Sequence, residues 1–214
     1  MSEKNQKILS LANYVNLDRL IFLVDGVFAI TMTLLVLELR LPEAEVEDFS
    51  QSLRDMLPRL FIYLIAFYSI ANHWIAHQRM FRRITDADTT LVWLTLLWLL
   101  FLTLIPAATA IVGRFPAEKL AAACFSINSF LQAGVSSIFW RYVLKNHERY
   151  ASDSDPRLLR ITSQVWLLIS GGWLISVALG FIQVNFAYIS WVVWPNLAAV
   201  WGSQKRKTIP DLEQ

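Results

Sequence analysis

One carboxylate lies inside a long apolar segment near the start of the chain. Asp25 falls within residues 20–39, six residues after Arg19, which places it ~9 Å further along a helix axis. If this segment crosses a membrane, the carboxylate must face protein or water, because a charge facing lipid is costly. Six residues also turn a helix by ~600°. We therefore expect Arg19 and Asp25 to point in different directions and not to form a direct ion pair.

A second segment supplies a candidate partner for Asp25. His73 and His77 share one helical face at positions i and i+4. His73 precedes Arg79 by six residues, just as Asp25 follows Arg19 by six, so His73 and Asp25 would lie at equal depth. This match permits a hydrogen bond or ion pair between them and makes His73 the candidate partner. The pair could be a polar clasp that holds two helices together, or it could handle protons or cations directly.

A metal site is not expected at the two histidines. The spacing His-x-x-x-His can bind zinc, but a catalytic zinc site takes three protein ligands and an open position. Trp74 stands where the zinc-protease motif has its glutamate. No cofactor is expected.

The outer half of the first apolar segment carries a stripe of apolar side chains. Ile30, Leu34 and Leu37 recur at i, i+4 and i+7, and Thr33 borders the stripe. On spacing alone, such a stripe is typical of a surface that packs against lipid or protein. A constriction that gates a pore by excluding water is the rarer use.

Composition indicates that the elements carrying these residues are membrane helices. Hydrophobic residues make up 56% of the 214 residues, and mean hydropathy is positive. A bilayer core takes about 20 helical residues to cross. Six segments have that length: 20–39, 58–78, 89–112, 119–142, 159–181 and 185–202. The sequence therefore predicts an all-α polytopic membrane protein with six transmembrane helices, forming one domain over residues 1–204 with a tail at 205–214.

Lysine and arginine predict the orientation, because they concentrate on the cytoplasmic side. With the N-terminus inside, the inner flanks hold Lys4, Lys7, Arg19, Arg79, Arg82, Arg83, Arg141, Lys145, Arg149, Arg157, Arg160, Lys205, Arg206 and Lys207. The outer flanks hold Arg40, Arg54, Arg59, Arg114 and Lys119. The first outer loop is acidic, with Glu43, Glu45, Glu47 and Asp48. Both termini are expected in the cytoplasm, and the protein in the cell membrane.

Other features limit the function. The loops leave no room for a soluble catalytic domain, and the phosphate loop, the nucleophile elbow and the carbonyl potassium filter are absent from the sequence. An enzyme is not expected, and the net charge of +2 does not suggest nucleic acid as a partner. The fourth segment carries a seam of small residues that suits contact within or between subunits: Ala122, Ser126, Ser129, Ala133 and Ser137.

The first segment resembles the signature of the transmembrane protein 175 family. The family pattern Arg-x-x-x-Phe-Ser-Asp is matched by Arg19 and Asp25 in register, with Leu23 and Val24 in place of the Phe and Ser. The similarity continues through Gly26 and on to 33–34. In the second segment, the His-Trp pair at 73–74, followed by His77 and then the Phe-Arg pair at 81–82, is also similar to the family.

The resemblance implies a potassium channel. A single signature with six spans is similar to the prokaryotic form, which is a homotetramer whose first helix lines the pore. By position, Ile30, Leu34 and Leu37 would form the apolar constriction that gates the pore. Thr33 would form a hydroxyl layer that contributes to selectivity. The partners would be potassium ions and the lipid bilayer, and conduction would be passive.

The resemblance also implies a polar network behind the pore that includes Arg19, Asp25, His73, Trp74 and His77. A second hypothesis remains beside the channel. In it, the protein is a proton-coupled transporter or proton conductor that uses Asp25 and His73 as titrating groups.

Overall fold

The computed structural model describes residues 16–37, 39 and 49–209, all in helices and short connections. The helices are α2 (Leu17–Val36), α3 (Phe49–Phe81), α4 (Thr89–Thr103), α5 (Ile105–Arg114), α6 (Lys119–Lys145), α7 (His147–Tyr150), α8 (Pro156–Ile182) and α9 (Val184–Lys207). The acidic first outer loop and the end of the tail lie outside the described residues. The all-α prediction is confirmed for the part of the chain that the structure describes.

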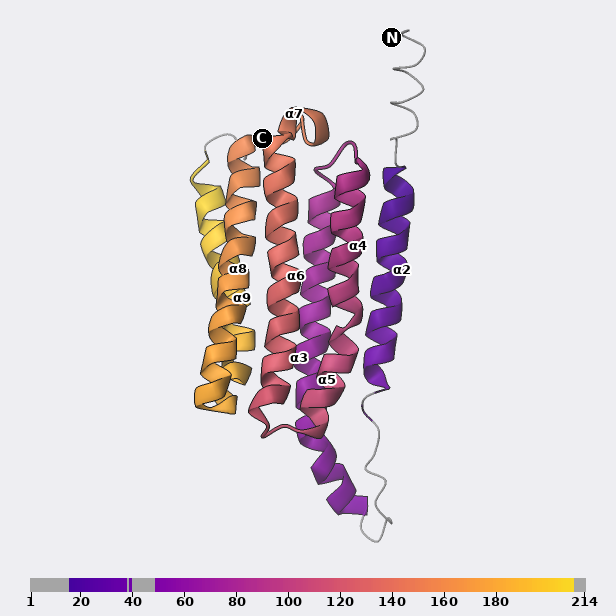
Figure 1. Ribbon diagram of the computed structural model, residues 1–214, viewed down its shortest axis with the longest axis vertical. Helices are drawn as coiled ribbons and strands as arrows, with labels where there is room; N and C mark the ends of the chain where they lie inside the picture. The colour runs from indigo at the N-terminus through magenta and orange to yellow at the C-terminus, as the bar shows by residue number, and fades with distance from the viewer. Residues whose placement is uncertain (1–15, 38, 40–48, 210–214) are drawn as a thin grey trace.

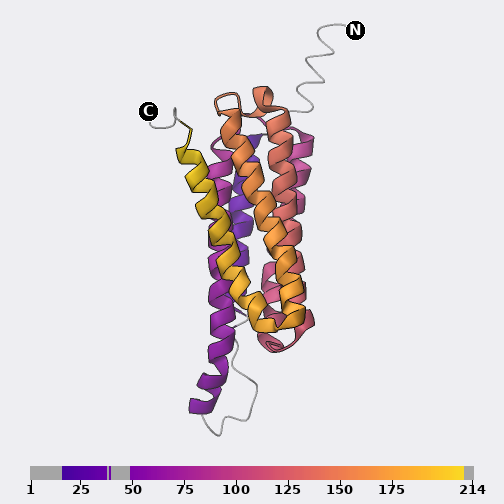
Figure 2. The same ribbon diagram turned by 90° about the vertical axis from the view of Figure 1, so that its left-hand side faces the viewer.

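The long helices run nearly parallel to one another and form an elongated bundle (Figure 1). One flank consists of α6, α8 and α9, and α2 lies at the opposite edge. The largest helix–helix interface joins α6 to α8, whereas α2 contacts α3, α4 and α5. Figure 2 shows α9 crossing in front of the bundle toward the side where α3 lies.

Five helical stretches are long and apolar enough to span a membrane, judged over the described residues. They are Leu17–Val36, Met56–Phe81, Thr89–Arg114, Lys119–Lys145 and Pro156–Ile182. Each coincides with one of the first five predicted spans. The sixth predicted span, 185–202, is helical within α9, but α9 is not among the five. A count of six spans therefore stays a prediction, as do the orientation of the termini and the homotetramer.

The third predicted span is divided into two helices. α4 ends at Thr103 and α5 begins at Ile105, with Pro106 in its first turn. Proline has no backbone N–H to donate and its ring clashes with the preceding turn, so a helix usually breaks or kinks there. α9, in contrast, continues through Pro195.

The seam of small residues on α6 packs inside the chain. All five of its side chains are buried, and α6 lies against α8 along much of its length. The Ser126 and Ser176 hydroxyls are 3.2 Å apart, and the Trp191 indole N–H of α9 donates to the Ser126 oxygen over 2.9 Å. Small side chains let the helix backbones approach closely, and the Ser126 hydroxyl finds its partners within the bundle, whereas the buried Ser137 hydroxyl has none among the described residues.

A close approach between α8 and α9 depends on one glycine. The indole N–H of Trp194 donates to the Leu168 carbonyl over 2.8 Å, which lays the ring across Gly172. A Cβ atom at residue 172 would overlap that ring, whereas a Cβ atom at Gly171 would meet nothing within 4 Å. The two neighbouring glycines therefore differ sharply in what they tolerate.

We expect Gly172→Ala to lower the thermal unfolding midpoint in detergent, because the Trp194 ring must leave its site. Overpacking of this kind costs about 1–3 kcal/mol. Gly171→Ala is the matched control and should be neutral or slightly stabilising, since alanine favours a helix over glycine by about 1 kcal/mol. Equal midpoints for the two variants would contradict the packing described here.

Candidate functional site

The first helix presents two different faces. Its buried side chains are Leu20, Val24, Phe28, Thr31 and Leu35, and they pack toward the neighbouring helices. On another side of the helix Ile30 is 60% exposed, Leu34 46% and Leu37 51%. Within a single chain, the predicted apolar stripe is therefore an open surface.

Thr33 lies on the same open surface. Its hydroxyl donates to the Ile30 carbonyl over 2.8 Å. The hydroxyl proton is therefore committed to the helix backbone, and the lone pairs of the oxygen are left to face outward. An oxygen in that state can accept a hydrogen bond or contact a cation.

Asp25 joins α2 to α3. Its Oδ1 atom accepts a hydrogen bond from the Trp74 indole over 3.1 Å and a second from the Gln78 amide over 2.9 Å. The carboxylate is half-buried between the helices. Because both donors belong to α3, the carboxylate acts as a clasp between the two helices.

The prediction that His73 pairs with Asp25 is wrong. The Nδ1 atom of His73 lies 2.7 Å from the Ser69 carbonyl, and its ring lies near the Trp98 and Trp166 rings. Equal depth along the helix axis placed His73 next to Trp74, which does bond Asp25. Depth does not fix the direction in which the His73 side chain points. Trp74 is one residue further on and points ~100° away around the helix axis. That rotation directs Trp74 toward α2 and His73 away from Asp25.

His77 is a packing residue. It is only 3% exposed, and its ring stacks on Phe81 with the centroids 4.2 Å apart and on Trp98 at 5.5 Å. Neither ring nitrogen has a hydrogen-bond partner among the described residues. His77 is therefore separate from the Asp25 cluster, in contrast to the predicted network.

Arg19 lies apart from Asp25 as well. Its side chain is exposed, and its backbone N–H is capped by the Asn16 side chain over 3.2 Å. The ion pairs recorded for the described residues are Arg149–Asp86 and Arg157–Asp155. The expectation that Arg19 and Asp25 form no direct pair agrees with this. Of the five predicted network residues, the structure brings together only Asp25 and Trp74.

Gln78 is the residue that sequence reasoning missed. It follows Trp74 at i+4, so the two share a helical face. A long amide side chain in the span of an apolar helix is itself a signal, because it needs a polar partner there. In the described ranges, no three His, Cys, Asp or Glu side chains lie close enough together to hold a metal ion.

Comparison with known proteins supports the family resemblance that the sequence suggested. The family model described as endosomal/lysosomal potassium channel TMEM175 matches residues 19–106. A potassium channel of Chamaesiphon minutus is 28% identical over 75% of this chain and 82% of its own length. A potassium channel of Streptomyces collinus is also 28% identical, over 74% of this chain and 80% of its own. The mouse endosomal/lysosomal proton channel TMEM175 is 29% identical over 48% of this chain and 21% of its own length.

Solved structures agree with the sequence matches. The crystal structure of a lysosomal potassium-selective channel TMEM175 homolog from Chamaesiphon minutus superposes with a TM-score of 0.76 at 26% identity, over 87% of this chain and 97% of that one. A variant of the potassium channel MtTMEM175, crystallised with a nanobody–MBP fusion protein, shares the fold at 20% identity and a TM-score of 0.62. The chain is therefore similar to TMEM175 channels in the sequence of residues 19–106 and in its fold. The family and these relatives are ion channels, not enzymes.

We expect Asp25→Ala to destabilise the protein, because it leaves the Trp74 and Gln78 donors without their acceptor. Hydrogen bonds to a charged group contribute about 1.5–3 kcal/mol each, so the thermal unfolding midpoint should fall clearly. Asp18→Asn is the control: Asp18 is an exposed carboxylate in the first turn of the same helix. If both variants unfold at the same temperature, Asp25 does not act as a clasp.

Proposed function

We propose that this membrane protein is a passive, potassium-selective cation channel whose pore is lined by α2. The observation that carries the proposal is the open face of α2, where Ile30, Thr33, Leu34 and Leu37 lie exposed. The channel names of the bacterial relatives, which match most of the chain, support it. A surface of this kind on a pore-lining helix would meet the permeating ion.

The proposed assembly is a homotetramer. One helix cannot enclose an ion path, so several copies of α2 must surround an axis. The position of α2 at one edge of the bundle, with α3, α4 and α5 on its other side, leaves it accessible to further copies (Figure 1). In this arrangement Asp25 and its donors on α3 lie behind the pore and fix how α2 is rotated.

The gate is proposed at Ile30. A ring of four isoleucine side chains would leave a dry gap, and a hydrated cation crosses such a gap only at high cost. Leu34 and Leu37 would continue the apolar lining. A small tilt or rotation of α2 would widen the ring and let water enter, so no re-entrant loop is needed.

Selectivity is assigned to the Thr33 layer. Its outward-facing oxygen can replace part of the water shell of an ion, because its proton is already donated to the Ile30 carbonyl. Preference for potassium over sodium should be modest, since a few hydroxyls replace less of the shell than a cage of fixed carbonyls does.

The proposal also covers the location of the chain in the cell membrane and the side on which its termini lie. Both termini are assigned to the cytoplasm of the cell, with residues 1–204 forming one channel domain in the cell membrane and 205–214 a tail. The clusters of lysine and arginine at the ends of α3 and α9 support this orientation. α9, which contacts α8 and α6, would be the sixth span.

Proton conduction is the second candidate, because the animal relatives are named proton channels. Those relatives match about a fifth of their own length. The particular route through an Asp25–His73 pair has no support, since Asp25 is bonded to Trp74 and Gln78. A proton conductor would have to use Asp25 without that histidine.

We expect purified protein in planar lipid bilayers to give a potassium-directed reversal potential under opposed potassium and sodium gradients. Thr33→Ala should move that potential toward zero, because the hydroxyl layer is lost. Thr103→Ala is a close control, since the Thr103 hydroxyl donates to the Leu100 carbonyl over 2.9 Å in the same way on α4. A current that follows only a proton gradient would overturn the potassium proposal and favour the second candidate.

We expect Ile30→Asn to raise the resting potassium current at least about tenfold, because a polar ring wets the constriction and removes more than about 1.4 kcal/mol from the barrier. Ile189→Asn is the control: Ile189 is 61% exposed but belongs to α9, far from the α2 edge. An unchanged current in a well-folded Ile30→Asn protein would remove Ile30 from the gate.

A further inference from the structure

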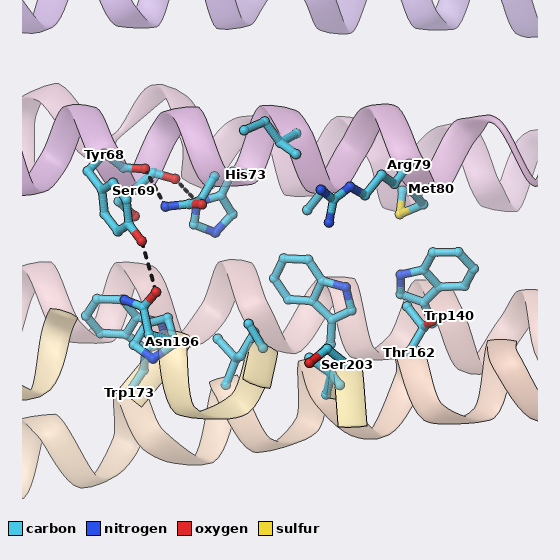
Figure 3. A pocket seen from close by; sticks show the side chains of 18 of the residues that line it. Tyr68, Ser69, His73, Arg79, Met80, Trp140, Thr162, Trp173, Asn196 and Ser203 are labelled. Carbon is cyan, nitrogen blue, oxygen red and sulfur yellow. Dashed lines mark hydrogen bonds between the residues drawn. The ribbon is translucent and has the colours of Figure 1, made fainter. Parts of the chain in front are cut away.

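A cavity of about 350 Å³ lies between α3 on one side and α6, α8 and α9 on the other (Figure 3). Its volume is typical of small-molecule sites, which measure roughly 300–1,000 Å³. None of the residues proposed for the pore lines it. The cavity therefore needs an explanation of its own.

One end of the cavity is strongly basic. Arg79 and Arg83 of the α3 end and Arg206 of the α9 end all line it, and no Asp or Glu is among the described lining residues. Burial and the guanidinium groups of Arg206 and Arg79 lower the pKa of Arg83. Burial and Arg79 likewise lower the pKa of Arg206. Three positive charges thus repel one another around a space that holds no counter-charge from the described chain.

The same end carries unsatisfied hydrogen-bond donors. The Nε atom of Arg206 and the indole Nε1 atom of Trp140 are buried without a partner among the described residues. Both residues line the cavity. A buried donor left unpaired costs about 1–3 kcal/mol. Because these groups only donate, a ligand that accepts hydrogen bonds and carries negative charge would satisfy them.

The other end of the cavity combines aromatic and aliphatic walls with a few polar side chains, among them Tyr68, Ser69 and Asn196. Its walls include Phe125, Trp173 and Trp191, together with Ile169 and Val165. Along α3 the lining extends from Ile65 to Met80, which is ~22 Å of helical rise. A ligand that fits the cavity would therefore carry a negative charge at the basic end and apolar groups along the aromatic and aliphatic walls.

The rim of the cavity opens sideways between α3 and α9. Exposed lining residues come from both helices: Tyr68 and Ile75 on α3, and Asn196 and Ala199 on α9. A single hydrogen bond crosses the gap between the described side chains, from the Tyr68 hydroxyl to the Asn196 Oδ1 atom over 3.0 Å (Figure 3). With α9 as the proposed sixth span, an opening between α3 and α9 would face the bilayer.

We infer that this cavity binds an anionic phospholipid, with the headgroup phosphate at Arg79, Arg83 and Arg206 and one acyl chain along the aromatic walls. A free phosphate would satisfy the basic end but leave the apolar length empty. A helix from a second copy would bring backbone groups that are already bonded to one another and would leave the arginines unpaired. The inference rests on the membrane location and the cavity, and it does not depend on ion conduction.

The test measures phosphatidylglycerol bound to the purified full chain, by native mass spectrometry and by thermal stabilisation in detergent. We expect phosphatidylglycerol to bind and stabilise, and phosphatidylcholine to do so far less. The double variant Arg83→Gln with Arg206→Gln should weaken phosphatidylglycerol binding at least about tenfold, because two charge-assisted hydrogen bonds are lost. Arg82→Gln with Lys205→Gln is the matched control: both side chains are exposed neighbours that do not line the cavity.

A second variant tests the apolar half without touching the arginines. Ala199→Phe should fill the acyl-chain part and also weaken phosphatidylglycerol binding, whereas Ala178→Phe, at an exposed α8 position outside the cavity, should not. Equal stabilisation by inorganic phosphate would assign the site to a free anion and overturn the lipid inference. Equal loss in the Arg82/Lys205 control, or a changed oligomeric state in place of changed lipid binding, would overturn it as well.

Discussion

The need to satisfy one carboxylate inside a membrane determines how the first helix is placed. Asp25 cannot face lipid, so it turns toward α3, where Trp74 and Gln78 supply two N–H donors to one oxygen. Ile30 follows five residues later, which places it ~140° around the helix axis from Asp25. A clasp on the inner side of α2 therefore holds the isoleucine face outward. The Ile30 stripe is exposed because Asp25 is bonded to α3 on another side of α2. The spacing of the stripe alone would allow it to face either inward or outward.

The two halves of the bundle are held by different kinds of contact. α6, α8 and α9 are joined by small residues and by a chain of hydroxyls, in which Ser190 donates to Ser176 over 2.7 Å and the Trp191 indole donates to Ser126. These groups have no water to bond with in a membrane, so each hydroxyl–hydroxyl contact fixes the register of two helices. α2 has a smaller interface with the rest of the chain and relies on apolar packing of Phe28 plus the Asp25 clasp. This less extensive interface would let α2 tilt, as the proposed gating requires, more readily than a position within the α6–α8 seam.

The sequence predicts position along a helix axis far better than direction around it. Length and hydropathy located five helices that are long and apolar enough to cross a membrane, since a bilayer demands about 20 apolar residues whatever the helices pack against. The same reasoning put Asp25 and His73 at one depth but could not tell His73 from Trp74, because one residue of offset is ~100° of rotation. The small-residue seam on α6 was visible, yet its partner could have been another subunit or α8, and only packing decides that. The roles proposed for Ile30 and Thr33 came from resemblance to a family, and no spacing argument alone would have selected them.

α3 contacts both the Asp25 carboxylate and the basic cavity. One of its faces, through Trp74 and Gln78, holds the acid of the proposed pore helix. A neighbouring face, through His73 and Arg79, lines the basic cavity. Because successive residues of a helix are rigidly related, a displacement of α3 that changes the cavity must also move the donors of Asp25. Suppose that α3 can take two positions. An occupant of the cavity that binds more tightly to one of them would bias the rotation of α2, whereas an occupant that binds both equally would not. The magnitude of that bias equals the difference in binding free energy. For the proposed channel and the inferred lipid, it would be measured as a change in open probability between bilayers of different lipid charge.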